Sequence, residues 1–226
     1  MIVSFDVWNT LLDINVMLDA LSSSLAELLG ISDEEAKLEI LKAREEIKKL
    51  RKAQKGSPER ALEESQELLA KELNTNVEVV KRAAVKAVLK VAEEIIIDGA
   101  LETLKAVKTE HTIITVGNVM FWPSAYTRLI LERFGLADFI DRQFYSDELK
   151  AYKPMREFFE KALSHFPQSK ALHIGDTFEE DFKGALNAGL YAVWINPEAE
   201  GVRRIEERGF EVRQIRDLLD VLRSLK

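Results

Sequence analysis

The sequence predicts an α/β fold: a three-layer, Rossmann-like core around a parallel sheet, into which an all-α helical subdomain is inserted. Three observations lead to this prediction. Short apolar runs alternate with helical patterns from residue 98 onward, which is typical of parallel strands joined by right-handed crossovers. A block of consecutive helical patterns separates the first apolar run from the second. Two of the runs also lead directly to an aspartate, at the strand ends where open α/β sheets place their active sites.

The composition limits the range of functions. The chain has 226 residues, of which 46% are hydrophobic, enough apolar side chains for a core. Its net charge of −7 argues against a nucleic-acid-binding surface, which needs clustered positive charge. The absence of cysteine excludes disulfides and cysteine-based metal or redox sites. There is neither a signal-peptide pattern nor an apolar run long enough to span a membrane, so we expect a cytoplasmic protein without membrane contacts.

The first apolar run predicts a buried strand at the start of the chain. Ile2, Val3 and Phe5 form this run, which ends at Asp6. The segment Trp8-Asn9-Thr10 then breaks the pattern, because asparagine favours turns. Taken alone, Asp6 is either a functional carboxylate at a strand end or a simple turn or N-cap residue.

Residues 14–97 are predicted to form the inserted all-α subdomain, and residues 1–13 and 98–226 the α/β core. The first helix follows from apolar residues at three-four spacing and ends at Gly30. Ser32 and Glu35 form a capping box for the second, which runs to about Ala53. The third starts at Ser57-Pro58, and the fourth extends from Val77 to about Ile97. We interpret the charged residues of the second helix as a solvent-exposed face.

The core is predicted from the remaining alternation of strands and helices. Four segments are expected to be strands or to contain one, and a fifth is a small apolar patch; they are 112–116, 139–145, 171–174, 191–195 and 210–212. The helices expected between and after them start at Ala100, at Pro123, after Lys153-Pro154, after Asp176 and at Ile215.

Three motifs occur in a fixed order along the chain. They are Asp6-Val7-Trp8-Asn9-Thr10, Lys153-Pro154, and Gly175-Asp176 followed by Asp181. Together they resemble motifs one, three and four of the haloacid dehalogenase-like (HAD) hydrolase superfamily. The resemblance implies that the inserted helices form a cap over the active site and that Asp6 is the catalytic nucleophile. It also implies a Mg²⁺ ion held by Asp6, Asp176 and the main-chain carbonyl of Trp8, with Asp181 acting through water or on the other ligands.

The residue types suit this chemistry. A carboxylate that attacks a phosphate is repelled by it, and Mg²⁺ is a hard cation that prefers carboxylate and phosphate oxygens. Lys153 is the expected catalytic cation beside Asp6 and the phosphoryl group, with Lys150 as its competitor. Glu179 and Glu180 are alternatives to Asp181, although acidic residues are also common at helix N-termini.

Two positions depart from the family's phosphatase pattern. The second motif normally provides a serine or threonine for the phosphate, but Gly117 occupies that place. The backbone N–H groups of Gly117 and Asn118 are then candidate phosphate ligands, and the hydroxyl of Thr115 is another. Trp8 stands where the phosphatases carry a second aspartate as general acid and base. Asp13 is either a replacement proton donor or an entry residue of the cap.

Two further residues have open roles. His173 lies inside a predicted strand and is expected to be a hydrogen-bonded core residue. Trp122 is expected either to line the substrate pocket or to pack under the cap.

These observations predict a Mg²⁺-dependent phosphatase that hydrolyses a small phosphorylated metabolite through an aspartyl-phosphate, and that acts as a monomer or homodimer. Two alternatives stay open. Trp8 favours a 2-haloacid dehalogenase, since that branch of the family carries an aromatic residue at this position. Trp8 and Gly117 together favour a catalytically weak scaffold that binds a phosphorylated ligand.

Overall fold

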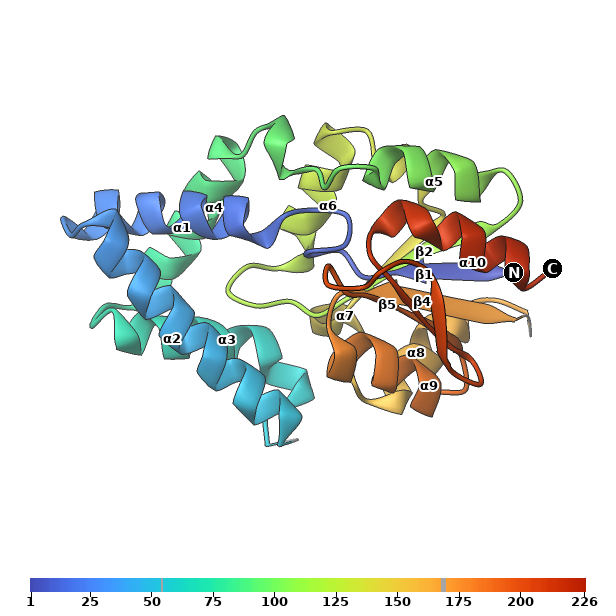
Figure 1. Cartoon of the computed structure of the whole chain (residues 1–226). Coiled ribbons are helices and arrows are strands. Elements are labelled where there is room, and N and C mark those ends of the chain that lie inside the picture. The colour runs from blue at the N-terminus through green and yellow to red at the C-terminus, as the bar shows by residue number, and fades with distance from the viewer. Residues whose placement is uncertain (54, 168–169) are drawn as a thin grey trace.

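The core of the protein is a twisted sheet flanked by helices (Figure 1). Over the described residues the sheet has seven strands in the order β3-β2-β1-β4-β5-β7-β6. It is seen in a computed structural model that describes residues 1–53, 55–167 and 170–226. The strands are β1 (Ile2–Phe5), β2 (Thr112–Gly117), β3 (Arg142–Tyr145), β4 (Ala171–Gly175), β5 (Tyr191–Ile195), β6 (Arg203–Glu206) and β7 (Gly209–Val212). All neighbouring strands are parallel except β6, which is antiparallel to β7. The α/β fold class expected from the sequence is confirmed.

The central strand β1 lies at the point where the strand order reverses. β1 pairs with β2 on one side and with β4 on the other, and the chain reaches β3 before it returns to β4. In open α/β sheets the ligand site lies beyond the carboxyl ends of the strands at such a switch point. The backbone N–H of Asp6 donates to the carbonyl of Ile174 at 2.8 Å, so the ends of β1 and β4 stay together one residue past β1.

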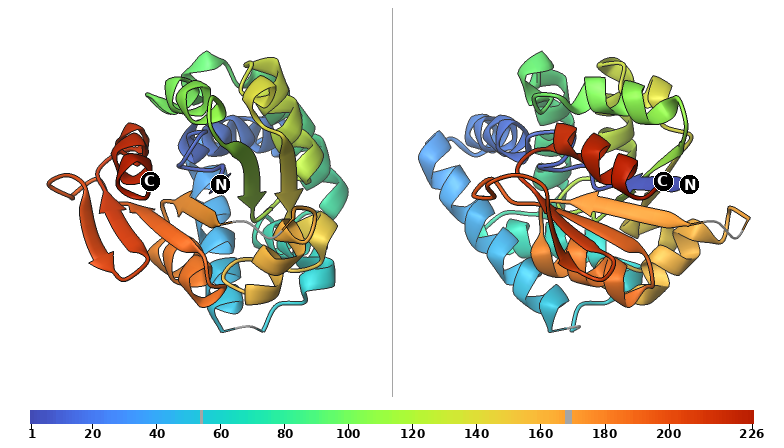
Figure 2. Two further views of the ribbon diagram at one scale, coloured as in Figure 1. Left: turned by 90° about the vertical axis from the view of Figure 1, so that its right-hand side faces the viewer. Right: turned by 45° about the vertical axis from the view of Figure 1, so that its right-hand side comes forward.

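Helices cover both faces of the sheet and give the expected three layers (Figure 2). Val3, Phe5 and Leu172 belong to one buried cluster, with the apolar sides of α5, α6 and α10. Ile114 and Ala192 belong to a second cluster on the opposite face, with α8 and α9. The helices of the core are α5 (Ala100–Lys108), α6 (Ser124–Arg133), α7 (Ser146–Leu149), α8 (Arg156–Leu163), α9 (Gly184–Asn187) and α10 (Leu218–Ser224).

Four of the five described α-helices between β1 and β2 pack together at the carboxyl edge of the sheet (Figure 1). They are α1 (Ile14–Leu29), α2 (Asp33–Lys52), α3 (Ala61–Glu72) and α4 (Val77–Lys90). Side chains of Asp13, Ser32 and Asn76 accept hydrogen bonds from the first turns of α1, α2 and α4, as N-cap residues do. We call this unit the cap. No single helix in the described part of the chain is long and apolar enough to cross a membrane.

The fourth cap helix is shorter than the sequence pattern suggests. α4 ends at Lys90 and not near Ile97, because the apolar residues that continue its pattern form the return connection to the core. The N–H of Ile97 donates to the carbonyl of Leu11 at 3.0 Å, and the N–H of Asp13 donates to that of Ile95 at 2.7 Å. The two chain segments that join cap and core therefore lie side by side.

The strand β6 was not expected from the sequence. β6 consists of Arg-Arg-Ile-Glu, which lacks the apolar alternation of a strand. It lies at the edge of the sheet, and its side chains are mostly exposed, so charged residues are tolerated there.

Candidate active site

Asp6 lies at the carboxyl end of β1, in a loop that turns back on itself before the cap begins. The N–H groups of Leu11 and Leu12 both donate to the carbonyl of Val7, at 2.8 and 2.9 Å. Asn9 has a φ of 60°, a left-handed conformation that asparagine tolerates better than most residues. Its side chain donates to Asp176 Oδ2 at 3.1 Å. The loop therefore brings the first and fourth motifs into direct contact.

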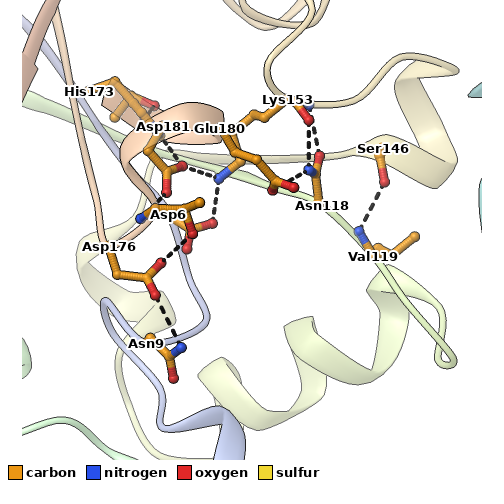
Figure 3. A network of polar contacts seen from close by, with 12 residues as sticks. Asp6, Asn9, Asn118, Val119, Ser146, Lys153, His173, Asp176, Glu180 and Asp181 are labelled. Carbon is orange, nitrogen blue, oxygen red and sulfur yellow. Dashed lines mark hydrogen bonds and ion pairs between the residues drawn. The ribbon is translucent and has the colours of Figure 1, made fainter. Parts of the chain in front are cut away.

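Lys153 forms the centre of the site (Figure 3). Its Nζ lies 2.5 Å from Asp6 Oδ1 and 2.6 Å from Asp181 Oδ1, and the residue is only 1% exposed. Asn118 fixes the backbone of Lys153, because its Oδ1 accepts from the Lys153 N–H at 2.9 Å and its Nδ2 donates to the Lys153 carbonyl at 3.0 Å. Burial alone would lower the pKa of Lys153, but the carboxylates of Asp181 and Asp6 outweigh burial and raise it. The ammonium group therefore stays charged.

Asp6, Asp176 and Asp181 form a cluster in which one carboxylate oxygen of each lies within 4.8 Å of the others. Asp176 follows β4 directly, and Asp181 lies in the helical turn after it. Both oxygens of Asp181 are already engaged. Its Oδ2 accepts from the Thr177 N–H at 2.9 Å, and its Oδ1 contacts Lys153 and, at 3.0 Å, His173 Nε2. The Asp176 oxygens also accept hydrogen bonds, from Asn9 at 3.1 Å and from the Thr177 hydroxyl at 3.2 Å, but these donors are neutral and leave its charge uncompensated. Asp6 and Asp176 are thus better placed than Asp181 to hold a further cation directly.

The negative charge of the three carboxylates exceeds the positive charge of Lys153, the ammonium group that contacts two of them. Burial raises the pKa of Asp6 well above its ordinary value, and burial together with the Asp181 charge raises that of Asp176. Burial would also raise the pKa of Asp181, but the Lys153 ammonium and the hydrogen bond from His173 outweigh it and lower that pKa. A buried cluster of oxygen ligands with surplus negative charge fits a hard divalent cation such as Mg²⁺.

His173 lies inside β4, as expected of a core residue, but it also contacts the site. It is opposite Ser4 in the strand register, and the Ser4 hydroxyl contacts its Nδ1 at 2.8 Å. Burial lowers the pKa of His173, so the ring is neutral. A chain of contacts from Ser4 through His173 therefore orients the Asp181 carboxylate. In the sequence, these contacts are indicated only by the two polar residues Ser4 and His173, which interrupt otherwise apolar strands.

Of the described residues expected to bind phosphate at the end of β2, only one lines the cavity over the site. Asn118 lines the cavity described below, whereas Thr115 is fully buried in the sheet and, like Gly117, is not among the described residues that line it. A Cβ atom on Gly117 would lie 3.2 Å from two ring carbons of Tyr145. A serine or threonine at this position would therefore require the Tyr145 ring to shift by a few tenths of an ångström, which favours glycine.

A cavity of about 350 Å³ lies over the carboxylate cluster, between the core and the cap. The core contributes its acidic and amide groups together with Trp8 and Trp122, whose rings meet edge-to-face with centroids 5.3 Å apart. Trp122 therefore lines the cavity, one of the two positions expected from the sequence. The cap contributes six residues, which are Ile14, Leu18, Arg44, Lys48, Arg51 and Lys52. The interpretation of the α2 charges as a solvent-exposed face is wrong for Arg51, which is buried, whereas Arg44 and Lys48 are half-buried and Lys52 is exposed.

The cap also contacts the loop that follows β2. Arg51 donates to the carbonyl of Val119, and Gln66 Nε2 donates to that of Phe121 at 3.0 Å. The Phe121 N–H in turn donates to the Ser65 hydroxyl at 2.9 Å. Phe121 has a φ of 62°, unusual for a phenylalanine, so these contacts hold a strained loop in place.

Other residues singled out in the sequence lie away from the reacting groups or at the cavity wall. Asp13 caps α1 by accepting from the Asn15 N–H at 2.8 Å, so its position is that of a cap-entry residue. Lys150 is exposed in a left-handed turn. Glu179 and Glu180 line the cavity, and Glu180 Oε2 accepts from Asn118 Nδ2 at 2.9 Å.

Comparison with known proteins identifies the family of the chain. The family model for haloacid dehalogenase-like hydrolases matches residues 1–189. The chain belongs to the haloacid dehalogenase-like hydrolase family. The resemblance seen in the three motifs is therefore confirmed, and the protein is a hydrolase of this family.

Two named relatives of this HAD hydrolase are phosphatases. It is 36% identical over 101 residues to the pyrimidine 5′-nucleotidase YjjG of Escherichia coli, covering 43% of this chain and 44% of the relative. It is 35% identical over 92 residues to the glyceraldehyde 3-phosphate phosphatase of Methanothermobacter thermautotrophicus, covering 39% and 41%. The matched stretches thus span less than half the length of these curated relatives.

A solved structure of the family shows the same fold over nearly the whole chain. The crystal structure of the HAD-hydrolase YfnB from Bacillus subtilis, bound to magnesium, aligns with a TM-score of 0.77 at 23% identity. The alignment covers 98% of this chain and 97% of that one.

Proposed function

We propose that this HAD hydrolase is a Mg²⁺-dependent phosphatase that hydrolyses a small phosphorylated metabolite through an aspartyl-phosphate on Asp6. The observation that carries the proposal is the arrangement around Lys153: three carboxylates within 4.8 Å of one another, two of them in contact with one buried ammonium group. Two aspartates at the ends of neighbouring strands repel each other, and they need a cation to share. The named phosphatase relatives support the same reaction type.

Asp6, Asp176 and the main-chain carbonyl of Trp8 would hold the Mg²⁺ directly, and Asp181 would hold it through water. When bound, the ion would neutralise charge on the phosphate oxygens. Asp6 attacks the phosphorus atom with a carboxylate oxygen, and the bond from phosphorus to the ester oxygen breaks. Water then attacks the aspartyl-phosphate and releases inorganic phosphate.

Lys153 has two roles in this scheme. Its ammonium group stabilises the charge that develops on the transferred phosphoryl group, and it orients the Asp6 carboxylate before the attack. The Asn118 side chain holds Lys153 in place, and Asn118 lines the cavity, so its backbone N–H is the proposed phosphate ligand at the end of β2. Gly117 is not among the described residues that line the cavity. Thr115 lies too deep in the sheet to share this role directly.

Trp8 lines the cavity where the family's phosphatases carry a general acid. Its indole offers an N–H donor but no group that titrates in the useful range, so the leaving group takes its proton from water. Loss of a general acid typically costs roughly 10²–10⁴-fold in rate. We therefore expect slow turnover of alkyl phosphates and faster turnover of esters with good leaving groups.

The test is hydrolysis of p-nitrophenyl phosphate with Mg²⁺ and with EDTA. We expect activity that requires Mg²⁺, no activity in Asp6→Asn, and weakened Mg²⁺ dependence in Asp176→Asn. Asp13→Asn is the matched control, since Asp13 lies in the same loop outside the cavity and asparagine preserves its N-cap. Full activity in Asp6→Asn would exclude the proposal.

The same preparation decides between the alternatives. Trp8 is the feature that favours a 2-haloacid dehalogenase, and metal-independent release of chloride from 2-chloropropionate would select that function. Mg²⁺-dependent binding of phosphate without hydrolysis of any ester would select a non-catalytic scaffold.

A further inference from the structure

The cap helix α2 presents four basic side chains to the cavity: Arg44, Lys48, Arg51 and Lys52. We call them the α2 basic row. Their spacing of four, seven and eight residues from the first places them on one side of the helix. The carboxylate cluster lies in the same cavity on the core side, so the cavity has an acidic wall and a basic wall.

Two members of the α2 basic row differ from the other basic residues of the same helix in their partners. Lys37, Lys42 and Lys49 each pair with a carboxylate, at 2.6, 2.7 and 3.8 Å. Among the residues that the structure describes, Arg44 and Lys52 lie within salt-bridge distance of none, and Lys48 has only Glu45, at 3.4 Å.

The row also brings like charges together. Arg44 and Lys48, and Lys48 and Lys52, are four residues apart, a spacing at which like charges destabilise a helix. An anionic ligand in the cavity would remove this repulsion. Arg44 and Lys52 therefore have the properties of a binding surface that an anionic ligand can neutralise, whereas the charge of Arg51 is partly balanced by the Glu180 carboxylate.

Arg51 fixes the position of the row. Its guanidinium is buried, donates to the Val119 carbonyl and lies over the Tyr152 ring at 5.8 Å from the centroid. These contacts tie α2 to the loop after β2, beside Asn118. The remaining members of the row are thereby held at the cavity wall.

We propose that the α2 basic row binds a second anionic group on the substrate, so that the preferred substrates are small phosphomonoesters that also carry a carboxylate or a second phosphate. The inference rests on the proposed function, in which the transferred phosphoryl group lies at Asp6 and Lys153. The rest of the substrate then extends toward the cap past Trp8 and Trp122. Arginine and lysine are the residues suited to carboxylate and phosphate. The cavity volume of about 350 Å³ is near the lower end for small-molecule sites and fits a compact metabolite.

The experiment compares matched pairs of substrates by kcat/KM. 3-Phosphoglycerate and glycerol 1-phosphate differ by a carboxylate in place of a hydroxymethyl group, and fructose 1,6-bisphosphate and fructose 6-phosphate differ by a second phosphate. We expect the doubly anionic member of at least one pair to be preferred at least tenfold. Whichever pair shows the preference identifies the second group.

Variants of α2 test whether the basic row causes that preference. Arg44→Gln and Lys48→Gln are each expected to lower the ratio of kcat/KM within the preferred pair by about tenfold. Lys49→Gln removes the same charge from the outer face of the helix, where Lys49 pairs with Glu46, and is expected to leave the ratio unchanged. Equal kcat/KM values within both pairs, or equal effects of Lys49→Gln and Arg44→Gln, would overturn the proposal.

Binding separates this inference from the proposed function. If no phosphomonoester is hydrolysed, the proposed function fails, and the same pairs are compared by quenching of tryptophan fluorescence in Mg²⁺-loaded protein. Tighter binding of the doubly anionic member, weakened by Arg44→Gln but not by Lys49→Gln, then still supports the basic row as an anion site. Indistinguishable binding within both pairs refutes it.

Discussion

Replacement of Lys153 by methionine is expected to destabilise the protein strongly, and to do so most when Mg²⁺ is absent. The ammonium group is buried and contacts two carboxylates, at 2.5 and 2.6 Å, within a cluster of three. Removal of one partner from a buried ion pair typically costs roughly 3–5 kcal/mol, because the remaining charge stays buried without compensation. In proteins of this size each kcal/mol lowers Tm by roughly 2–4 °C. The expected decrease in Tm is therefore about 6–20 °C.

Thermal unfolding followed by circular dichroism, with EDTA and with a series of Mg²⁺ concentrations, measures this effect. A cation at the cluster replaces part of the missing charge, so Mg²⁺ is expected to raise Tm more in Lys153→Met than in the wild type. Saturation to 100 times Kd contributes about 2.7 kcal/mol of stabilisation. Lys150→Met is the control, since Lys150 is exposed three residues earlier in the chain. A Tm for Lys153→Met in EDTA equal to that of Lys150→Met would refute the reasoning.

Four further predictions concern other residues of the site and of the cap. Trp8→Asp supplies a general acid and is expected to raise kcat on alkyl phosphates by roughly 10²-fold or more, whereas Trp8→Phe is not; a decrease in both variants would contradict this role. Burial raises the pKa of Asp6 above its unfolded value, so the folded state retains this proton to higher pH, and stability falls as pH rises from the unfolded pKa to the folded one. Asp6→Asn should therefore unfold at a higher urea concentration than the wild type at neutral pH in EDTA, while Asp13→Asn should not. An unchanged urea midpoint for Asp6→Asn would contradict a destabilising charge on Asp6. At pH values below the folded pKa of Asp6, a proton competes with Mg²⁺ for the carboxylate. The affinity for Mg²⁺, measured by calorimetry, should therefore decrease as pH is lowered, and a pH-independent affinity would argue against Asp6 as a ligand. Ser65→Ala removes the acceptor of the buried Phe121 N–H and should cost about 1–3 kcal/mol in urea unfolding; a variant as stable as the wild type would show that the contact is dispensable.

The sequence predicts the strands and the aspartates of this fold well because both depend on local patterns. The buried strands β1, β2, β4 and β5 are short apolar runs, and Asp6 and Asp176 follow two of them directly. Parallel strands must end at the same edge, so the approach of the two aspartates follows from topology.

Contacts that depend on three-dimensional packing were not predictable in the same way. The length of α4 was overestimated, since Ile95, Ile96 and Ile97 continue an apolar pattern but belong to the connection that pairs with residues 11–13. Likewise, the sequence shows that α2 has many basic residues, but not which of them face the cavity, because that depends on how the cap is placed over the core.

The paired connections between cap and core have a mechanical consequence. Leu12 and Ile96 form an isolated antiparallel bridge, and both crossing segments are joined by backbone hydrogen bonds. Two strands fixed to each other resist twisting and sliding, and they leave bending about a single axis as the easiest motion. The cap is therefore expected to move as a unit by bending at this pair of segments, and such a motion would have to break the hydrogen bonds that join α2 and α3 to the loop after β2.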